Sequence, residues 1–293
     1  MNLGKLGVWQ GLDSLTANEA LEFARRTERR GYQVLWTPES RGRNVLVNAA
    51  WLLAGTTTLT IATGIANIYG RDALAMANAQ KGLCEQSGNR FILGLGVSHK
   101  PIVSGIRGHD YGKPVATMKA YLEAMAAAPY QAPMPSERPR TVLAALGPKM
   151  LELARDKTDG AHPYCVTPEH TAEARRILGK DKWLAPEVMV LLEPDPAKAR
   201  AAARTALSFY VALDNYANNW RRLGFTEADL GNGGSDRFVD ANVAWGDAGA
   251  IKAKLQKYWD AGADHVCIQA IHPSGQRTTI DERIYDALAP AGV

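Results

Sequence analysis

Two side chains in this sequence could move protons, and each one follows an apolar, strand-like segment. His99 ends the segment Phe91–His99, FILGLGVSH, and Glu39 comes shortly after Tyr32–Thr37, YQVLWT. An imidazole titrates close to neutral pH, and a carboxylate can orient it or exchange a proton with it. Alone, His99 would be a hydrogen-bonded structural residue, and Glu39 an exposed carboxylate paired with the arginine two or four positions later. If both strands end at one mouth, the two side chains form an acid–base pair.

Small and polar residues follow other strand-like segments, at Gly64–Tyr69, Gly96–His99, Ala145–Gly147 and Tyr164–Thr167. A surface without large side chains lets a flat ring approach the backbone closely. Any one of these glycines is explained equally well by a turn. Taken as a set, they favour a planar ligand.

Two helix beginnings are predicted among these small residues, at Gly147-Pro148 and at Thr167-Pro168-Glu169. The free N–H groups at a helix N-terminus can hold a phosphate without special side chains. Ordinary capping explains both sequences as well. They support an anionic ligand and do not establish one.

Other site motifs are incomplete or absent. The segment LGLGVS lacks the third glycine and the following helix of a dinucleotide fingerprint, and no G-x-x-x-x-G-K-[ST] or G-x-S-x-G is present. His162-Pro-Tyr-Cys165 has a metal-like spacing but no second cluster, so we expect no metal site.

These residues are held by alternating apolar strands and helices. Strands buried on both faces and separated by helices are typical of a parallel sheet, whose ligands collect at the carboxyl ends of the strands. Helix caps are predicted at Thr16 (with Glu19 as a capping box), Asp72, Thr167 and Asp247, and further helices are predicted around Asn44–Gly55 and from Asp195. The predicted strands are Leu3–Trp9, Tyr32–Thr37, Leu59–Asn67, Phe91–His99, Arg140–Leu146, Asp159–Cys165, Pro186–Leu192 and Ala263–Ile271.

Eight strands with following helices predict an α/β fold, a single (β/α)₈ TIM barrel over residues 1–293. A doubly wound sheet with an extra domain is the alternative, because periodicity cannot show closure. Two insertions interrupt the alternation: a polar loop at Lys100–Lys113 after strand four, and an irregular segment at Asn215–Val243 between strands seven and eight. Long loops at strand ends are usually functional, so we expect both to shape a substrate pocket.

Composition limits the partners. The net charge is only +4 and no Lys/Arg cluster is interleaved with aromatic residues, so we expect no nucleic-acid partner. The three cysteines, Cys84, Cys165 and Cys267, are far apart and indicate buried free thiols in a reducing compartment. We find no secretory signal and no apolar run of membrane-spanning length, so we expect a cytoplasmic protein without membrane contact.

Longer motifs resemble a known family. TGIANIY with its following RDA helix, and NRFILGLGVSH, resemble the bacterial-luciferase-like monooxygenase superfamily. AALGPKMLELARDKTDGAHPYCVTPEH, DRFVDANVAWGD and AGADHVCIQ are similar to its actinobacterial branch that depends on coenzyme F420. The similarity covers nearly the whole chain, and the combination of motifs is more specific than any one of them.

The resemblance implies an oxidoreductase that transfers a hydride between the deazaflavin C5 and a small organic substrate. It implies a homodimer, and a non-prolyl cis peptide bond that supports the ring, here at Gly64-Ile65. Under it, His99 and Glu39 would be the catalytic residues. The cofactor contacts would be Gly64, Ile65, Ala66, Asn67, Val97, Ser98, Ala145, Leu146 and Gly147, with the phosphate end near Tyr164, Cys165, Val166 and Thr167.

Three alternatives stay open on the same barrel. One is an FMN-dependent monooxygenase that consumes oxygen with a reductase partner. Another is a non-catalytic barrel that binds flavin or deazaflavin. The third is a barrel for phosphorylated sugars without a redox cofactor.

Overall fold

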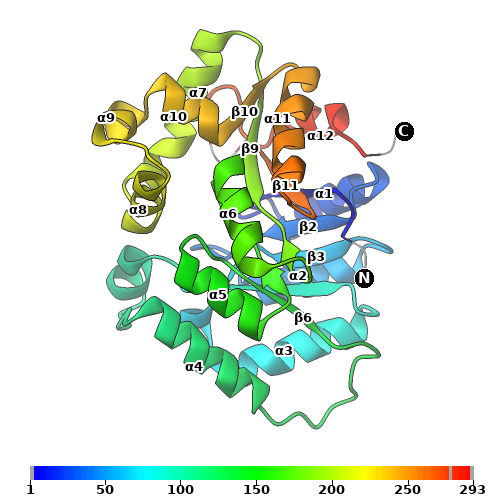
Figure 1. The fold of residues 1–293 in the computed structure, drawn as a ribbon. Helices are drawn as coiled ribbons and strands as arrows, with labels where there is room; N and C mark the ends of the chain where they lie inside the picture. Colours follow the sequence, from blue (N-terminus) through cyan, green and yellow to red (C-terminus); the bar gives the residue numbers. More distant parts are fainter. Residues whose placement is uncertain (1–2, 277–278, 291–293) are drawn as a thin grey trace.

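A curled parallel sheet organises the chain in the computed structural model, which describes residues 3–276 and 279–290 (Figure 1). Every pairing between its strands is parallel, as predicted for strands that alternate with helices. Its strands are β1 (Leu6–Trp9), β2 (Val34–Thr37), β3 (Thr60–Thr63), β4 (Ala66–Asn67), β5 (Phe91–Gly96), β6 (Arg140–Leu143), β7 (Gly160–Ala161), β8 (Trp183–Leu184), β9 (Glu187–Leu192), β10 (Val243–Gly246) and β11 (Val266–Ala270).

The sheet closes through the short link between β8 and β9. The hydrogen-bonded order runs β10-β9-β11-β1-β2-β3-β5-β6-β7-β8, so β8 and β9 lie near its two ends although only Ala185 and Pro186 separate them. The Ala185 N–H donates to the Ala161 carbonyl on one side (2.9 Å), and the Pro186 carbonyl accepts from the Cys267 N–H on the other (2.9 Å). This closure confirms the predicted TIM-type barrel over the doubly wound alternative. The two ends of the predicted domain, 1–2 and 291–293, lie outside the described residues.

Helices cover the outside of the barrel. Predicted caps are confirmed, including the Thr16–Glu19 capping box and the Thr167 side chain at the start of α6. Besides α7 (Pro196–Val211), which follows β9, the helices that follow strands are α1 (Ala17–Arg29), α2 (Val45–Ala54), α3 (Ala73–Gln86), α4 (Pro114–Ala126), α5 (Pro148–Lys157), α6 (Pro168–Leu178), α11 (Ala248–Asp260) and α12 (Arg283–Ala287).

Each strand contributes to two apolar layers. Alternate residues such as Val34 and Trp36 of β2 point into the barrel, where they pack with Ala62, Ile92 and Cys267. Leu35, between them, packs outward in the layer shared with the helices. This period of two follows from the pleat, and burial on both faces explains why the strands are apolar throughout.

The second insertion was predicted to be irregular, and that prediction is wrong. The chain there forms α8 (Asp214–Arg222), α9 (Glu227–Leu230), α10 (Asp236–Asn242) and then the extra strand β10. These helices gather on one side of the barrel in Figure 1, beside α7, the helix predicted to begin at Asp195. Trp220, Phe238 and Val239 are fully buried there and form a small core of their own. These helices are short and are separated by turns, so no periodic pattern continues long enough to distinguish them from a loop.

Other predicted boundaries shift at the carboxyl ends of the strands. Residues 97–99, 144–146 and 162–165, predicted as strand, leave the ladder and form the barrel mouth, and the predicted loop after strand four contains a π-helix at Pro101–Ile106.

All three cysteines are buried free thiols, as predicted. Within the described residues, no helix combines the length and the apolar character needed to cross a bilayer.

Candidate cofactor site

The segment Gly64–Asn67 forms a floor in the barrel mouth. The peptide bond between Gly64 and Ile65 is cis, as the resemblance implied. The Trp9 indole N–H donates to the Gly64 carbonyl (3.0 Å), and a Cβ at Gly64 would collide with the Trp9 indole. The Ile65 side chain packs over Gly96, where a Cβ would also collide. Close packing therefore favours glycine at both positions, and the segment that links β3 to β4 lies against β5.

Glu39 holds this floor in place. Its Oε2 accepts the Asn67 N–H (2.8 Å), and its carboxylate forms an ion pair with Arg71. The Glu39 side chain is only 5% exposed, so the expectation of an exposed carboxylate paired with Arg41 or Arg43 is wrong. Arg71 is 32 residues away in sequence, and only the fold brings it near Glu39.

His99 lies at the mouth, half-buried against the second insertion. Its Nδ1 is 3.2 Å from Asn215 Oδ1, and its ring lies 5.7 Å from that of Tyr216. Burial lowers the pKa of His99, which keeps the imidazole neutral at pH 7. Because the amide oxygen only accepts, Nδ1 carries the proton and Nε2 is left as an acceptor. Within the described chain no hydrogen bond joins His99 to Glu39, so they do not form a direct pair.

Aromatic side chains close the mouth from the insertion side. Tyr164 lies 5.0 Å from the Trp9 ring, and its hydroxyl bonds to the Tyr210 hydroxyl and to Gln269 Oε1, both at 2.6 Å. Tyr216 of α8 lies 6.2 Å from the Tyr164 ring. The insertion, which sequence analysis proposed as pocket-forming, contributes Tyr216, and the preceding helix α7 contributes Tyr210.

The residues expected to hold the cofactor's phosphate end surround two helix N-termini. Gly147 precedes α5 without any side-chain cap, and a Cβ there would meet nothing within 4 Å. Cys165, with φ of 54°, and the buried Val166 lead into Thr167, the cap of α6. Open space at an uncapped N-terminus and small neighbours such as Ala145 fit the phosphate side chain of a flavin or deazaflavin.

Other predicted contacts line the same mouth. Leu146 presents its carbonyl to His170 Nε2 (2.8 Å) and to the Arg222 guanidinium (3.1 Å). Val97 and Ser98 are half-buried after β5, and the Ser98 carbonyl accepts from the Tyr111 hydroxyl (3.1 Å). Sequence analysis missed these partners, which come from other elements of the fold.

Glu187 is a buried carboxyl that sequence analysis overlooked. It begins β9, is fully buried, and accepts the Cys165 N–H at Oε2 (2.9 Å), while Oε1 has no hydrogen-bond partner among the described residues. Burial raises its pKa to about 8, so the carboxyl is protonated at neutral pH. The visible clue was one glutamate in the otherwise apolar run EVMVLL.

Glu187→Gln is expected to change the slope of folding stability against pH by about one proton between pH 5 and 8, in the direction of higher stability at higher pH. The unfolded carboxyl loses its proton near pH 4.5, whereas the folded one keeps it to about pH 8, so the contribution of Glu187 to stability falls as pH rises through this window and is absent in the variant. One proton corresponds to about 1.4 kcal/mol per pH unit. Urea unfolding at pH 5.5, 6.5 and 7.5 measures the change, with the exposed Glu137→Gln as control. An unchanged slope would contradict the buried protonated state.

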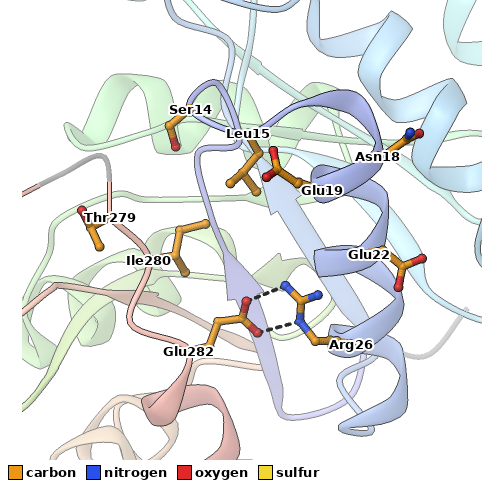
Figure 2. A pocket seen from close by; sticks show the side chains of 9 residues that line it. All are labelled: Ser14, Leu15, Asn18, Glu19, Glu22, Arg26, Thr279, Ile280 and Glu282. Carbon is orange, nitrogen blue, oxygen red and sulfur yellow. Dashed lines mark hydrogen bonds and ion pairs between the residues drawn. The ribbon is translucent and has the colours of Figure 1, made fainter.

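A separate surface hollow of about 550 Å³ lies between α1 and the segment around Ile280 (Figure 2). Its charged groups already have partners: Glu282 forms an ion pair with Arg26 (2.6 Å), and Glu19 caps α1. None of the predicted site residues lines it.

Comparisons with known proteins agree with this geometry. A family model described as luciferase-like monooxygenase matches residues 2–265. A Mycobacterium tuberculosis protein with the provisional name coenzyme F420-dependent oxidoreductase is 24% identical, over 92% of this chain and 95% of its own.

Two solved structures share the fold. The coenzyme F420-dependent tetrahydromethanopterin reductase from Methanopyrus kandleri superposes with a TM-score of 0.75 at 15% identity, over 99% of this chain and 98% of that one. The oxygenating constituent of 3,6-diketocamphane monooxygenase from Pseudomonas putida, in complex with FMN, gives 0.69 at 14% identity, over 98% of both chains. The family model spans most of the chain and the barrel agrees with it, so the chain belongs to the luciferase-like monooxygenase family.

Proposed function

We propose that this protein is an F420-dependent oxidoreductase that transfers a hydride between the deazaflavin and a small organic substrate. The observation that carries the proposal is the floor Gly64–Asn67, whose strand β4 pairs with β5, the strand that ends three residues before His99. The name of the M. tuberculosis relative supports F420, and the FMN complex of a structural neighbour keeps FMN as the alternative. When bound, the deazaflavin supplies a carbon centre that donates or accepts the hydride.

The chain's own residues would hold the cofactor in two parts. Gly64, Ile65, Ala66 and Asn67, with Val97 and Ser98, would support the ring against backbone. Ala145–Gly147 and Tyr164–Thr167 would hold the side chain and its phosphate at the two helix N-termini. Glu39 would act as a positioning residue, because its carboxylate binds the Asn67 N–H and not the mouth itself.

His99 would handle the proton that accompanies the hydride. Asn215 fixes the ring with Nδ1 protonated, so Nε2 can accept a proton from a substrate hydroxyl as a hydride leaves the adjacent carbon. In the reverse direction the protonated ring returns that proton to the carbonyl oxygen. Electrons and protons balance without a further group.

His99→Gln is expected to lower kcat by about 100-fold or more, because a positioned acid–base group contributes about 10²–10⁴-fold. The Kd for F420 should change less than twofold, since the ring contacts lie on the floor. Anaerobic assays of F420 absorbance with a panel of alcohols and ketones measure turnover. His109→Gln, an exposed histidine on the following loop, is the control. Unchanged turnover in His99→Gln would remove this residue from the mechanism.

The cofactor itself is tested by titration. We expect F420 to bind with a change in its fluorescence and FMN to bind at least tenfold more weakly. Tight FMN binding with oxygen consumption in the presence of a reductase would overturn the proposal in favour of a monooxygenase. Tight F420 binding with no turnover over the panel would favour a barrel that only binds its ligand.

A further inference from the structure

A second hollow, of about 350 Å³, adjoins the floor and is lined by arginines. It lies between the loop after β2, the turn after β4 and the π-helix after β5. We call it the arginine hollow, and define it by Arg41, Arg43, Arg71 and Arg107 together with Glu39. Apart from Glu39 and its partner Arg71, none of these residues has a role in the reaction described above.

Positive charge in the arginine hollow exceeds negative charge. Glu39 is matched by Arg71. Arg43 donates a side-chain hydrogen bond to the Leu15 carbonyl, and Asp13 accepts its backbone N–H (3.0 Å), which leaves the Arg43 Nε buried and unpartnered. Within the described residues, the Arg41 and Arg107 guanidinium groups form no hydrogen bond or ion pair. Arg41, Arg43 and Arg107 thus line a space whose one carboxylate, that of Glu39, is already paired with Arg71.

The space between these groups is kept open by Gly70. A Cβ there would lie 3.5 Å from Glu39 Oε2 and 3.6 Å from Arg107 Nη1. The N-terminus of α2, capped by Asn44, opens at the same hollow and adds a positive partial charge. Guanidinium groups bind phosphate and carboxylate through paired N–H donors. We propose that the arginine hollow binds a phosphate or carboxylate group of the substrate.

The location of the hollow connects it to the reacting site. Glu39 both lines the hollow and holds the floor through Asn67. The π-helix Pro101–Ile106, which Arg107 follows, begins two residues after His99, and the His99 carbonyl accepts the Ile102 N–H (2.9 Å). A substrate with an oxyanion in the hollow would extend toward His99.

The cofactor is a weaker candidate for this group. Its proposed phosphate site follows β6 and β7, whereas the hollow follows β2, β4 and β5. One phosphate cannot occupy both places. This assignment to the substrate rests on the proposed function, whereas anion binding by the hollow does not.

Inorganic phosphate is the probe. In protein labelled with ¹⁵N-arginine, we expect the Nε–H resonances of Arg41 and Arg107, assigned from single variants, to shift saturably with phosphate at constant ionic strength. Arg107→Gln should weaken phosphate binding by at least tenfold, as measured from the shift of the Arg41 Nε–H resonance. Gly70→Leu should weaken phosphate binding to the same extent without changing the charge. The control Arg29→Gln, which removes one exposed positive charge, should leave phosphate affinity unchanged. Shifts that chloride reproduces, or binding unchanged in Arg107→Gln or Gly70→Leu, would overturn the site.

F420 titration distinguishes the two sources of the anion. We expect Arg107→Gln to bind F420 within twofold of the wild type, which supports assignment to the substrate. A tenfold loss of F420 affinity would assign the group to the cofactor and overturn the substrate assignment. If the wild type does not bind F420, the proposed function fails, and the phosphate titration still decides whether the hollow is an anion site.

Discussion

Gly94→Ala is expected to destabilise the protein by more than about 4 kcal/mol and to abolish cofactor binding, because the new methyl group has no room. A Cβ at Gly94 would lie closer than 3.0 Å to the Thr63 carbonyl oxygen, a backbone atom that no rotamer change can move. Thr63 Oγ1 already bonds both the Gly94 carbonyl (2.7 Å) and its N–H (2.8 Å). The two strands must separate, and Thr63 directly precedes the floor at Gly64.

Urea unfolding measures the stability of this variant, and fluorescence titration measures its F420 affinity. The matched control is Gly231→Ala, where φ is −67° and a Cβ would meet nothing within 4 Å. It should change stability by less than about 1 kcal/mol. Where Gly94→Ala does not fold, Gly96→Ala provides a milder test, because there the obstacle is the flexible end of the Ile65 side chain. Native stability and affinity in Gly94→Ala would show that the strands are not packed this closely.

The barrel was predictable because its pattern is local and repeated. Each strand is indicated by an apolar run. Each helix is indicated by a capping residue at its start, such as Thr16 or Asp247, and by a glycine just after its end, such as Gly31 or Gly262. The carboxyl ends of parallel strands then fall on one rim, so the positions of Gly64 and His99 at a common mouth follow from topology.

The partners at the mouth were not predictable in the same way. Glu39 pairs with Arg71, and His99 with Asn215, across 32 and 116 residues of sequence. No period or motif encodes such pairs, since they depend on how loops pack after the barrel has closed. The second insertion shows the same limit, because Trp220 and Phe238 make a core that only the folded helices reveal.

Buried polar groups were the hardest to foresee. His162 stacks on Trp36 at 4.2 Å inside the barrel, in a segment first considered for metal binding because of its spacing to Cys165. Glu187 interrupts an apolar strand, and its burial could be known only from the closed sheet. In both cases the residue type suggested surface chemistry, whereas the structure encloses the side chain.

Acid is expected to unfold this protein steeply between pH 6.5 and 4, because three histidines are buried in the neutral form. Burial lowers the pKa of His162, His170 and His265 to about 4 each. The hydrogen bonds agree with neutral rings: His265 Nε2 accepts the Trp36 indole N–H (3.2 Å), which a protonated ring could not do. Below pH 6.5 the unfolded chain therefore binds protons that the folded chain excludes, and stability is lost as pH falls toward 4.

Three protons correspond to a slope of up to about 4 kcal/mol per pH unit, enough to unfold an ordinary domain within two or three units. Glu187 acts in the opposite direction, because between pH 8 and 4.5 its folded carboxyl holds up to one proton that the unfolded chain has released. The net slope of stability against pH should therefore stay near two protons between pH 6 and 5. Urea unfolding at half-unit steps measures the slope directly. His170→Gln should reduce it by one proton whatever its effect on absolute stability, and the exposed His109→Gln should leave it unchanged. A slope below one proton in the wild type would mean that these rings are charged in the folded state, in conflict with the packing of His162 against Trp36 and with the bond from Trp36 to His265.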